Sequence, residues 1–199
     1  MSPENFNKNN DPNNLKRIEL IDEESRSLPC YVEKELDVQD VHYLLVSPVD
    51  TSIRILALDG SEEETDDSEL ILIEDPEEID EIFENAKAVL SELNLLLKNT
   101  AYSLTVEGEI PPFDEDQVIS LELEEEDLDE EEPLEPEELQ FLTSFYHGKY
   151  KYSIYTPLDP LLYIVKQTSN GKLELIDHED PQLKPIIEAF LFEDQDDEN

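Results

Sequence analysis

An internal repeat with an offset of 109 residues constrains this chain more than any other feature of its sequence. Residues 42–50 (HYLLVSPVD) match residues 151–159 (KYSIYTPLD), so that a tyrosine, a proline and an aspartate recur at the same spacing. Apolar positions on both sides of these segments match as well, and each copy later reaches the tripeptide Glu-Asp-Pro, at 74–76 and 179–181. An ordered series of this length indicates two copies of one module.

Each copy has the pattern of a β-meander followed by a helix. Apolar patterning predicts strands at 30–36, 41–46, 53–58 and 70–73 in the first copy and at 139–145, 150–155, 162–166 and 173–176 in the second. Pro48 and Pro157 end the second strand of each copy, because proline cannot donate a hydrogen bond to a strand ladder. Dipeptides ending in glycine, at 59–60 and 170–171, are typical of hairpin turns, and the acidic residues 61–69 enlarge the first turn.

The helix of the first copy has the clearest sequence boundaries. Asp75 suits the N-cap position and Pro76 suits the first helical position. Apolar residues then recur at helical spacing from Ile79 to Leu97, with Lys98 at the end. A second, shorter helix is predicted around residues 186–191, so both copies end in a helix.

The predicted fold class is α+β, with two related modules, each a small antiparallel β-meander plus a C-terminal helix, joined by an acidic disordered segment. Two further strands are predicted before that segment, at 102–106 and 118–123. Residues 124–138 contain too few apolar side chains to offset the entropy of ordering. The expected organisation is a disordered tail at 1–14, a first module at 15–98, a connecting segment at 99–138 with the disordered linker at 124–138, a second module at 139–193 and an acidic tail at 194–199.

The charge of the chain is large and unevenly distributed. The sequence has 54 acidic and 13 basic side chains, for a net charge of −41. Residues 15–98 and 99–138 each carry −17, whereas residues 139–193 carry only −2. Such a chain is a poor ligand for nucleic-acid phosphates and for anionic membrane surfaces. No segment has the roughly 20 apolar residues of a membrane span, so we expect a cytoplasmic protein without direct nucleic-acid binding or membrane insertion.

Residues that carry catalysis or hold cofactors show no recognisable arrangement. The chain has only four glycines, in no phosphate-binding pattern, and its three histidines lack the spacing of zinc ligands. The acidic loops do not follow the ligand order of an EF-hand. Cys30, the only cysteine, lies in a predicted strand and is expected to be a small buried hydrophobic residue. We predict no catalytic residues, no metal ligands and no cofactor.

The segments LIDEE at 20–24 and YLLVSPVD at 43–50, followed by an acidic loop and an acidic helix start, carry a family resemblance. This pattern is similar to the YrzB-like bacterial family, known as domain of unknown function 1292. Over about residues 15–193, the chain resembles a cyanobacterial and plastid group in which a second related domain, domain of unknown function 3727, follows the first. The resemblance implies a small acidic protein and no particular chemistry.

Aromatic residues gather in the second copy, where five of the eight tyrosines lie between residues 146 and 163. Strand alternation places Tyr150, Tyr152 and Ile154 on one face of the sheet and Tyr155 on the other. Because tyrosine is enriched at protein interfaces, we predict a partner-binding face formed by Tyr146, Lys149, Tyr150, Lys151, Tyr152, Tyr155 and Tyr163. The predicted acidic steering segment comprises Glu124, Glu125, Glu126, Asp127, Asp129, Glu130, Glu131 and Glu132.

These features predict a non-enzymatic interaction or assembly protein that binds a basic protein surface. Long-range attraction would come from the acidic segments and specific recognition from the tyrosine-rich face. One alternative is a divalent-cation-dependent enzyme or a protein that responds to Ca²⁺ or Mg²⁺. A second alternative is a nucleic-acid mimic that occupies a basic site on another protein.

Overall fold

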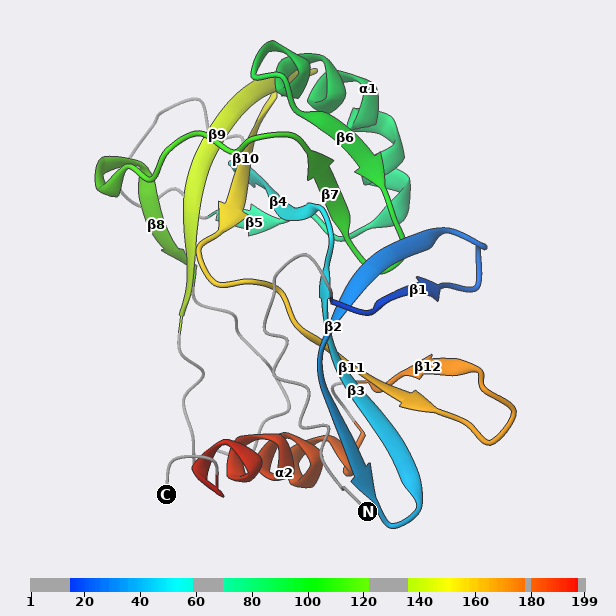
Figure 1. Ribbon diagram of the computed structural model, residues 1–199. Helices are drawn as coiled ribbons and strands as arrows, with labels where there is room; N and C mark the ends of the chain where they lie inside the picture. Colours follow the sequence, from blue (N-terminus) through cyan, green and yellow to red (C-terminus); the bar gives the residue numbers. More distant parts are fainter. Residues whose placement is uncertain (1–14, 59–69, 122–135, 178–179, 197–199) are drawn as a thin grey trace. The chain divides into compact units, whose positions relative to one another are not determined.

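The structure is a computed structural model that describes residues 15–58, 70–121, 136–177 and 180–196 (Figure 1). In the first half of the chain it contains β1 (Arg17–Ile21), β2 (Ser27–Val38), β3 (Val41–Pro48), β4 (Thr51–Leu58), β5 (Leu70–Leu72), α1 (Pro76–Glu92) and β6 (Leu96–Asn99). In the second half it contains β7 (Leu104–Glu107), the 3₁₀ turn η1 (Glu115–Gln117), β8 (Val118–Leu121), β9 (Glu137–His147), β10 (Tyr150–Pro157), β11 (Tyr163–Gln167), β12 (Leu173–Leu175) and α2 (Leu183–Asp196). The predicted α+β class is confirmed, and each predicted strand has an observed counterpart.

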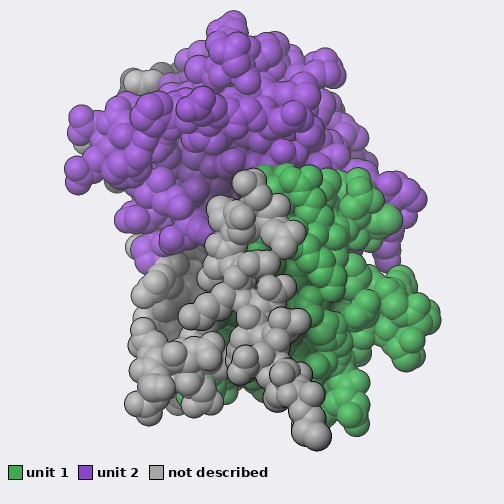
Figure 2. All heavy atoms as spheres, viewed as in Figure 1, with its two compact units in different colours: residues 1–21, 27–49, 162–199 green, residues 22–26, 50–161 purple. Residues whose placement is uncertain are grey.

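The strands form two antiparallel sheets, one in each of two compact units (Figure 2). Unit 1 comprises residues 1–21, 27–49 and 162–199; its sheet has the order β1-β2-β3-β11-β12, and it includes α2. Unit 2 comprises residues 22–26 and 50–161; its sheet has the order β6-β7-β4-β10-β9-β8 with β5 paired to β4, and it includes α1. Neither helix that the structure describes is long and apolar enough to cross a membrane.

The two sequence repeats interleave instead of folding as separate modules. In unit 1, β3 of the first repeat pairs with β11 of the second, and in unit 2, β4 of the first pairs with β10 of the second. Each unit therefore combines the first two meander strands of one repeat with the last two strands and the helix of the other. The predicted pair of self-contained modules is wrong, because apolar periodicity identifies strands but does not specify which strand edges pair.

The registers of the two cross-repeat pairs reproduce the sequence offset. Tyr152 pairs with Ala57 in unit 2, and the residues at the corresponding repeat positions, Tyr43 and Lys166, pair in unit 1. The next pairs along the strands keep this correspondence. Because a slip of one residue would move every side chain to the opposite face, the shared register shows that the repeat extends to the backbone pairing.

A β-bulge recurs at one position of the repeat. The pairing of β2 with β3 leaves out Glu33, and the pairing of β9 with β10 leaves out Leu142, which lies 109 residues later. A bulge leaves one residue outside the ladder and increases the local twist. The two side chains differ: Glu33 is exposed and accepts a hydrogen bond from Ser47, whereas Leu142 is buried. The backbone distortion is therefore retained while the side chain at this position has changed.

The main core of unit 2 lies between α1 and one face of the sheet. α1 buries Ile82, Ala86 and Leu90, which are spaced by four residues and so lie along one side of the helix. They belong to the same buried cluster as Ile55 and Ile154, which pair across the repeats. Packing of the helix therefore depends on strands from both copies.

The opposite face of this sheet carries a second apolar cluster. Its buried members are Leu56, Leu139 and Tyr155. Phe141 packs edge-on against Tyr155, with ring centroids 5.6 Å apart, a geometry favoured by the ring quadrupoles. Tyr155 therefore faces away from Ile154 and α1, as strand alternation predicts.

α1 ends at Glu92, before the predicted end of the apolar helical pattern. Asn94 has a φ of 59°, a left-handed conformation that asparagine tolerates better than most residues. Beyond this turn, Leu95 and Leu97 are buried while Leu96 is exposed, which is the period of the strand β6. The predicted helix over this segment is wrong because Leu93, Leu96 and Leu97 also fit helical spacing.

Lys98, expected at the end of that helix, instead joins two strands to the turn after β3. Its Nζ lies 2.8 Å from Asp50 Oδ2 and 2.6 Å from Glu107 Oε2. Hydrogen bonding to Asp50 and to Glu107 raises the pKa of Lys98, while the Lys98 hydrogen bond lowers the pKa of Glu107. Next to Glu107, Gly108 has a φ of +138°, and a Cβ there would lie 2.7 Å from Asn94 O. Glycine is therefore required where this segment passes the turn after α1.

Unit 1 has a smaller core beneath α2. Ile186 and Phe190 of the helix lie in one cluster with Leu36, Tyr43 and Ile164. β1, which no sequence prediction covers, adds an edge strand with a single buried side chain, that of Leu20. The strand has only five residues, and Ile21 breaks the polar–apolar alternation that Ile18 and Leu20 begin.

Cys30 is fully buried in unit 1, as expected for a small hydrophobic residue. Burial raises the pKa of its thiol to about 12. Since the thiolate is the reactive form, this cysteine is a poor nucleophile at neutral pH.

The acidic segment predicted as a linker joins two strands of one sheet. Residues 1–14, 59–69 and 122–135 lie outside the described residues, and so does most of the predicted disordered linker at 124–138. β9 begins at Glu137, which pairs with Leu121 at the end of β8. Residues 122–136 thus connect the paired ends of a β-hairpin within unit 2.

We predict that Ile154→Ala lowers the free energy of unfolding by about 2–5 kcal/mol, because it removes a fully buried side chain at a cross-repeat strand pair. Urea unfolding followed by circular dichroism measures the change. The matched control is Ile71→Ala on β5 of the same sheet, where the side chain is 47% exposed, and its cost is expected to stay below about 1 kcal/mol. An equal loss in the free energy of unfolding for the two variants would contradict the register assigned to the β4–β10 pair.

We also predict that replacing residues 122–136 by a loop one-third as long preserves the fold. Because Leu121 and Glu137 are already paired, the shorter loop closes at a lower entropic cost, and stability rises by about 1 kcal/mol. Urea unfolding at high salt, where repulsion between acidic side chains is screened, isolates this effect. A variant that unfolds would show that the loop is part of the packed structure.

Candidate functional site

The residues of the predicted partner-binding face do not form one surface in the structure. Tyr146 and Tyr150 are exposed, at 67% and 51% of their surface, whereas Tyr152 and Tyr155 are buried in the core. Tyr163 is half-buried and belongs to unit 1. Among the lysines of the prediction, Lys149 is exposed and Lys151 is half-buried. The residues of unit 2 available to a partner are therefore those at the β9–β10 hairpin end.

The exposed tyrosines lie on opposite faces of the hairpin. Tyr150 pairs with His147 and shares the face of Tyr152, which packs in the cluster of α1. Tyr146 pairs with Lys151 on the other face. The hairpin therefore offers an aromatic ring beside α1 and a second ring beside a lysine on the reverse side.

On the α1 side of this hairpin, the buried Tyr152 contacts a carboxylate of the helix. Tyr152 Oη donates a hydrogen bond of 3.0 Å to Glu78 Oε1. Burial, and then the carboxylate of Glu78, raises the pKa of Tyr152 to about 12, with smaller effects from the nearby Tyr150 and Glu81. Phe145 stacks on the Tyr152 ring at 5.3 Å. These contacts fix the carboxylate of Glu78 on the face of the hairpin that also carries the exposed Tyr150.

Asn85 connects α1 to the strand end. Its Nδ2 lies 3.4 Å from the carbonyl oxygen of Tyr146 and 3.4 Å from Nδ1 of His147. We call the surface formed by Glu78, Glu81, His147 and Tyr150 the helix–hairpin surface. Carboxylates of α1 and an exposed aromatic ring on the same face suit a lysine or arginine side chain, through charge-assisted hydrogen bonds and cation–π contact.

Acidic side chains surround the helix–hairpin surface. α1 exposes Glu77, Asp80, Glu81 and Glu84, and in the described part of the chain none of them has an ion-pair partner. Residues 59–69, which join β4 to β5 in the sequence, include seven acidic side chains. The exposed carboxylates along α1 therefore attract cations.

The charge distribution over the two units differs from the distribution along the sequence. Unit 2 has 37 acidic and 6 basic side chains, a net charge of −31, whereas unit 1 carries −10. The tyrosine-rich strands belong to the nearly neutral second sequence repeat, yet they fold into the strongly acidic unit. The predicted steering residues Glu124–Glu132 lie outside the described residues, although the sequence places them within unit 2.

A pocket of about 370 Å³ opens at the edge of the same sheet. It lies beside β4 between the end of the β7 pairing at Ile53 and the start of the β5 pairing at Leu56. Its lining comprises Glu24, Arg26, Ile53, Arg54, Ile55, Leu72, Ile73, Glu74, Pro76, Ile79, Asp80, Asn99, Thr100, Tyr102, Ser103 and Leu104. The sequence contains no local motif for this pocket, because its walls come from four separate segments.

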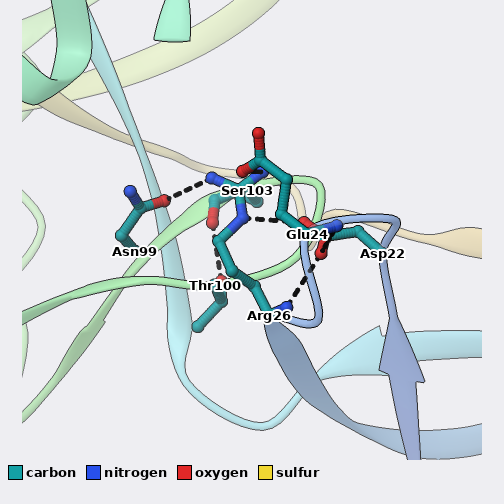
Figure 3. A network of polar contacts seen from close by, with 6 residues as sticks. All are labelled: Asp22, Glu24, Arg26, Asn99, Thr100 and Ser103. Carbon is teal, nitrogen blue, oxygen red and sulfur yellow. Dashed lines mark hydrogen bonds and ion pairs between the residues drawn. The ribbon is translucent and has the colours of Figure 1, made fainter. Parts of the chain in front are cut away.

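A polar network centred on Arg26 forms one wall of the pocket (Figure 3). The guanidinium contacts Asp22 at 2.7 Å, Glu24 at 3.3 Å and Asn99 at 3.0 Å. Asp22 also accepts a hydrogen bond of 2.8 Å from the backbone N–H of Arg26. Burial opposes ionisation of Asp22, but the hydrogen bonds from Arg26 outweigh it and lower the pKa of this carboxyl. The network therefore holds Arg26 as a neutralised charge.

Arg54, a second lining residue, is also paired. Its Nη2 lies 3.5 Å from Oε1 of Glu137, and both side chains are largely buried. Arg54 Nε and Glu137 Oε2 are buried without hydrogen-bond partners among the described residues. Because these two atoms belong to the same ion pair, a small closure of the side chains would make the contact bidentate.

Within the described segments, no group of three or more histidine, cysteine, aspartate or glutamate side chains is placed to hold a metal ion.

Two family models match the chain over nearly its whole length. Residues 23–91 match the model described as a protein of unknown function (DUF1292), and residues 94–194 match the model described as a protein of unknown function (DUF3727). No curated protein and no solved structure gives a match. Both matches agree with the resemblance predicted from the sequence.

We predict that Tyr152→Phe lowers the free energy of unfolding by about 1 kcal/mol, because Glu78 loses its hydrogen-bond donor. The raised pKa means that the folded state favours the neutral phenol, so this contribution is complete below about pH 10 and is lost as the pH rises toward about 12. Urea unfolding and absorbance titration of tyrosinate measure both effects. A variant with an unchanged high-pH titration would contradict the assigned environment of Tyr152.

Proposed function

We propose that this chain is a non-enzymatic cytoplasmic adaptor that binds a basic protein partner. The chain belongs to the family of proteins of unknown function DUF3727, and a DUF1292 domain precedes its DUF3727 match. The observation that carries the proposal is the position of the helix–hairpin surface within the unit of charge −31. The positioned carboxylate of Glu78 and the exposed Tyr150 lie on the same face of the hairpin, in a unit whose negative field concentrates cations. This combination supplies both attraction and a point of contact.

The binding would rely on several contacts of modest strength. Glu81 and Tyr150 are exposed, and single exposed ion pairs contribute only about 0–1 kcal/mol. A cation–π contact at an exposed ring adds about 0.5–1 kcal/mol. The acidic field mainly raises the association rate, and salt screens it. We therefore expect rapid, salt-sensitive association with a partner that presents several lysine or arginine side chains.

We predict that Glu77→Gln, Glu81→Gln and Glu84→Gln, introduced together, lower the association rate constant for an oligolysine peptide by about tenfold at low salt, because they remove part of the steering field. Stopped-flow fluorescence of a labelled peptide measures this rate. At high salt the difference from the unsubstituted protein is expected to disappear. Equal rates at low salt would refute the proposed steering role of α1.

A control with the same charge change separates local from global effects. Glu19→Gln, Asp40→Asn and Glu188→Gln remove three exposed charges from unit 1, and the association rate should fall less than for the α1 variant.

The role of the aromatic ring is tested by Tyr150→Ala against Phe113→Ala, since both rings are exposed in unit 2. Only Tyr150→Ala is expected to increase the dissociation rate. Saturable, stoichiometric Ca²⁺ binding would instead favour a cation-responsive function.

A further inference from the structure

The pocket beside α1 is a second candidate binding site, separate from the helix–hairpin surface. We infer that it binds a primary alkylammonium group, carried either by a lysine side chain of the basic partner or by a free polyamine. The lysine source deepens the proposed function and rests on it, whereas the polyamine source does not. The inference depends on the apolar wall, on two carboxylates that make no ion pair among the described residues, and on the paired state of both arginines.

The inner wall of the pocket fits an aliphatic chain. Ile53, Ile55 and Leu104 are buried side chains of neighbouring strands, and Ile79 lines the pocket from α1. A volume of about 370 Å³ accommodates a lysine stem. Long basic side chains gain stability by placing their methylene groups against apolar surface while the charged end remains near polar groups.

Two carboxylates at the pocket are available to an ammonium group. Glu74 and Asp80 line it, both are exposed, and within the described residues neither makes an ion pair. The carboxylate of Asp75 between them is already used, because it caps α1 by accepting a hydrogen bond of 2.8 Å from the N–H of Glu77. An ammonium group has three donors and no acceptor, and carboxylate oxygens match it.

The two arginines do not make this an anion site. Arg26 is held by Asp22 and Glu24, and Arg54 is held by Glu137. Counting these partners, five carboxylates surround two guanidinium groups, because Glu74 and Asp80 add to the three that are paired. A carboxylate or phosphate ligand would have to displace an existing partner and would enter a negative field. The cap at Asp75 also occupies an N–H at the end of α1 that would otherwise attract an anion.

The inference is tested by calorimetric titration of the full chain with 1,5-diaminopentane. A separate titration uses lysine amide acetylated at its α-amino group, which keeps the side-chain ammonium free. We expect saturable binding with one-to-one stoichiometry, weakened about tenfold or more by the double variant Glu74→Gln/Asp80→Asn. The control Glu92→Gln/Glu109→Gln removes two exposed charges of unit 2 outside the pocket and should retain the affinity. Both double variants change exposed side chains, and circular dichroism confirms their fold.

The outcomes separate this inference from the proposed function. Binding of the diamine that is lost only in the pocket variant supports an alkylammonium site even if oligolysine association proves independent of the helix–hairpin surface. Binding of the lysine amide with the same dependence assigns the group to a partner's lysine. The inference is overturned if the diamine shows no saturable binding, if both double variants lose affinity equally, or if acetate binds in its place.

Discussion

The fold depends on strand pairing between the two sequence repeats. The pairs β3–β11 and β4–β10 complete one sheet each, and without them each unit would have hydrogen-bonding edges exposed at its centre. Unpaired edges that bury apolar side chains are costly and prone to aggregation. Ile154 and Ile55 meet at one of these pairs within the core beneath α1. Hydrophobic burial and backbone pairing therefore both require the two repeats to fold together.

Sequence reasoning revealed the elements of this fold better than their assembly. Local signals defined the repeat, the strands and the start of α1 at Asp75, because periodicity, proline and capping depend on near neighbours. The exchange of strands between repeats was not predictable in this way, since apolar periodicity identifies strands but not the edges at which they pair. The end of α1 depended on Asn94, whose left-handed backbone outweighs a continuing apolar pattern. At the candidate site, sequence alternation predicted the faces of Tyr150 and Tyr155 but not the burial of the latter.

Interleaving also changes the interpretation of the charge. Along the sequence, the tyrosine-rich repeat is nearly neutral, and the acidic segment 99–138 lies between it and the acidic repeat. In the fold, its hairpin pairs with β4 and packs on α1, so Tyr150 shares the face of Tyr152, whose hydroxyl group donates a hydrogen bond to Glu78. The pocket has a similar origin, because Arg26 reaches Asn99 across 73 residues of sequence. Both candidate sites are therefore products of tertiary structure, which local motifs do not report.

The hairpin connection at residues 122–136 has a consequence for the integrity of the molecule. A single proteolytic cut there divides the chain between the repeats, and each fragment then contributes strands to both sheets. Neither unit can be completed from one fragment, so we expect the two fragments of the cleaved protein to stay folded only while they remain associated through both sheets. In this respect the molecule is organised like a strand-exchanged dimer whose two subunits have been fused into one polypeptide.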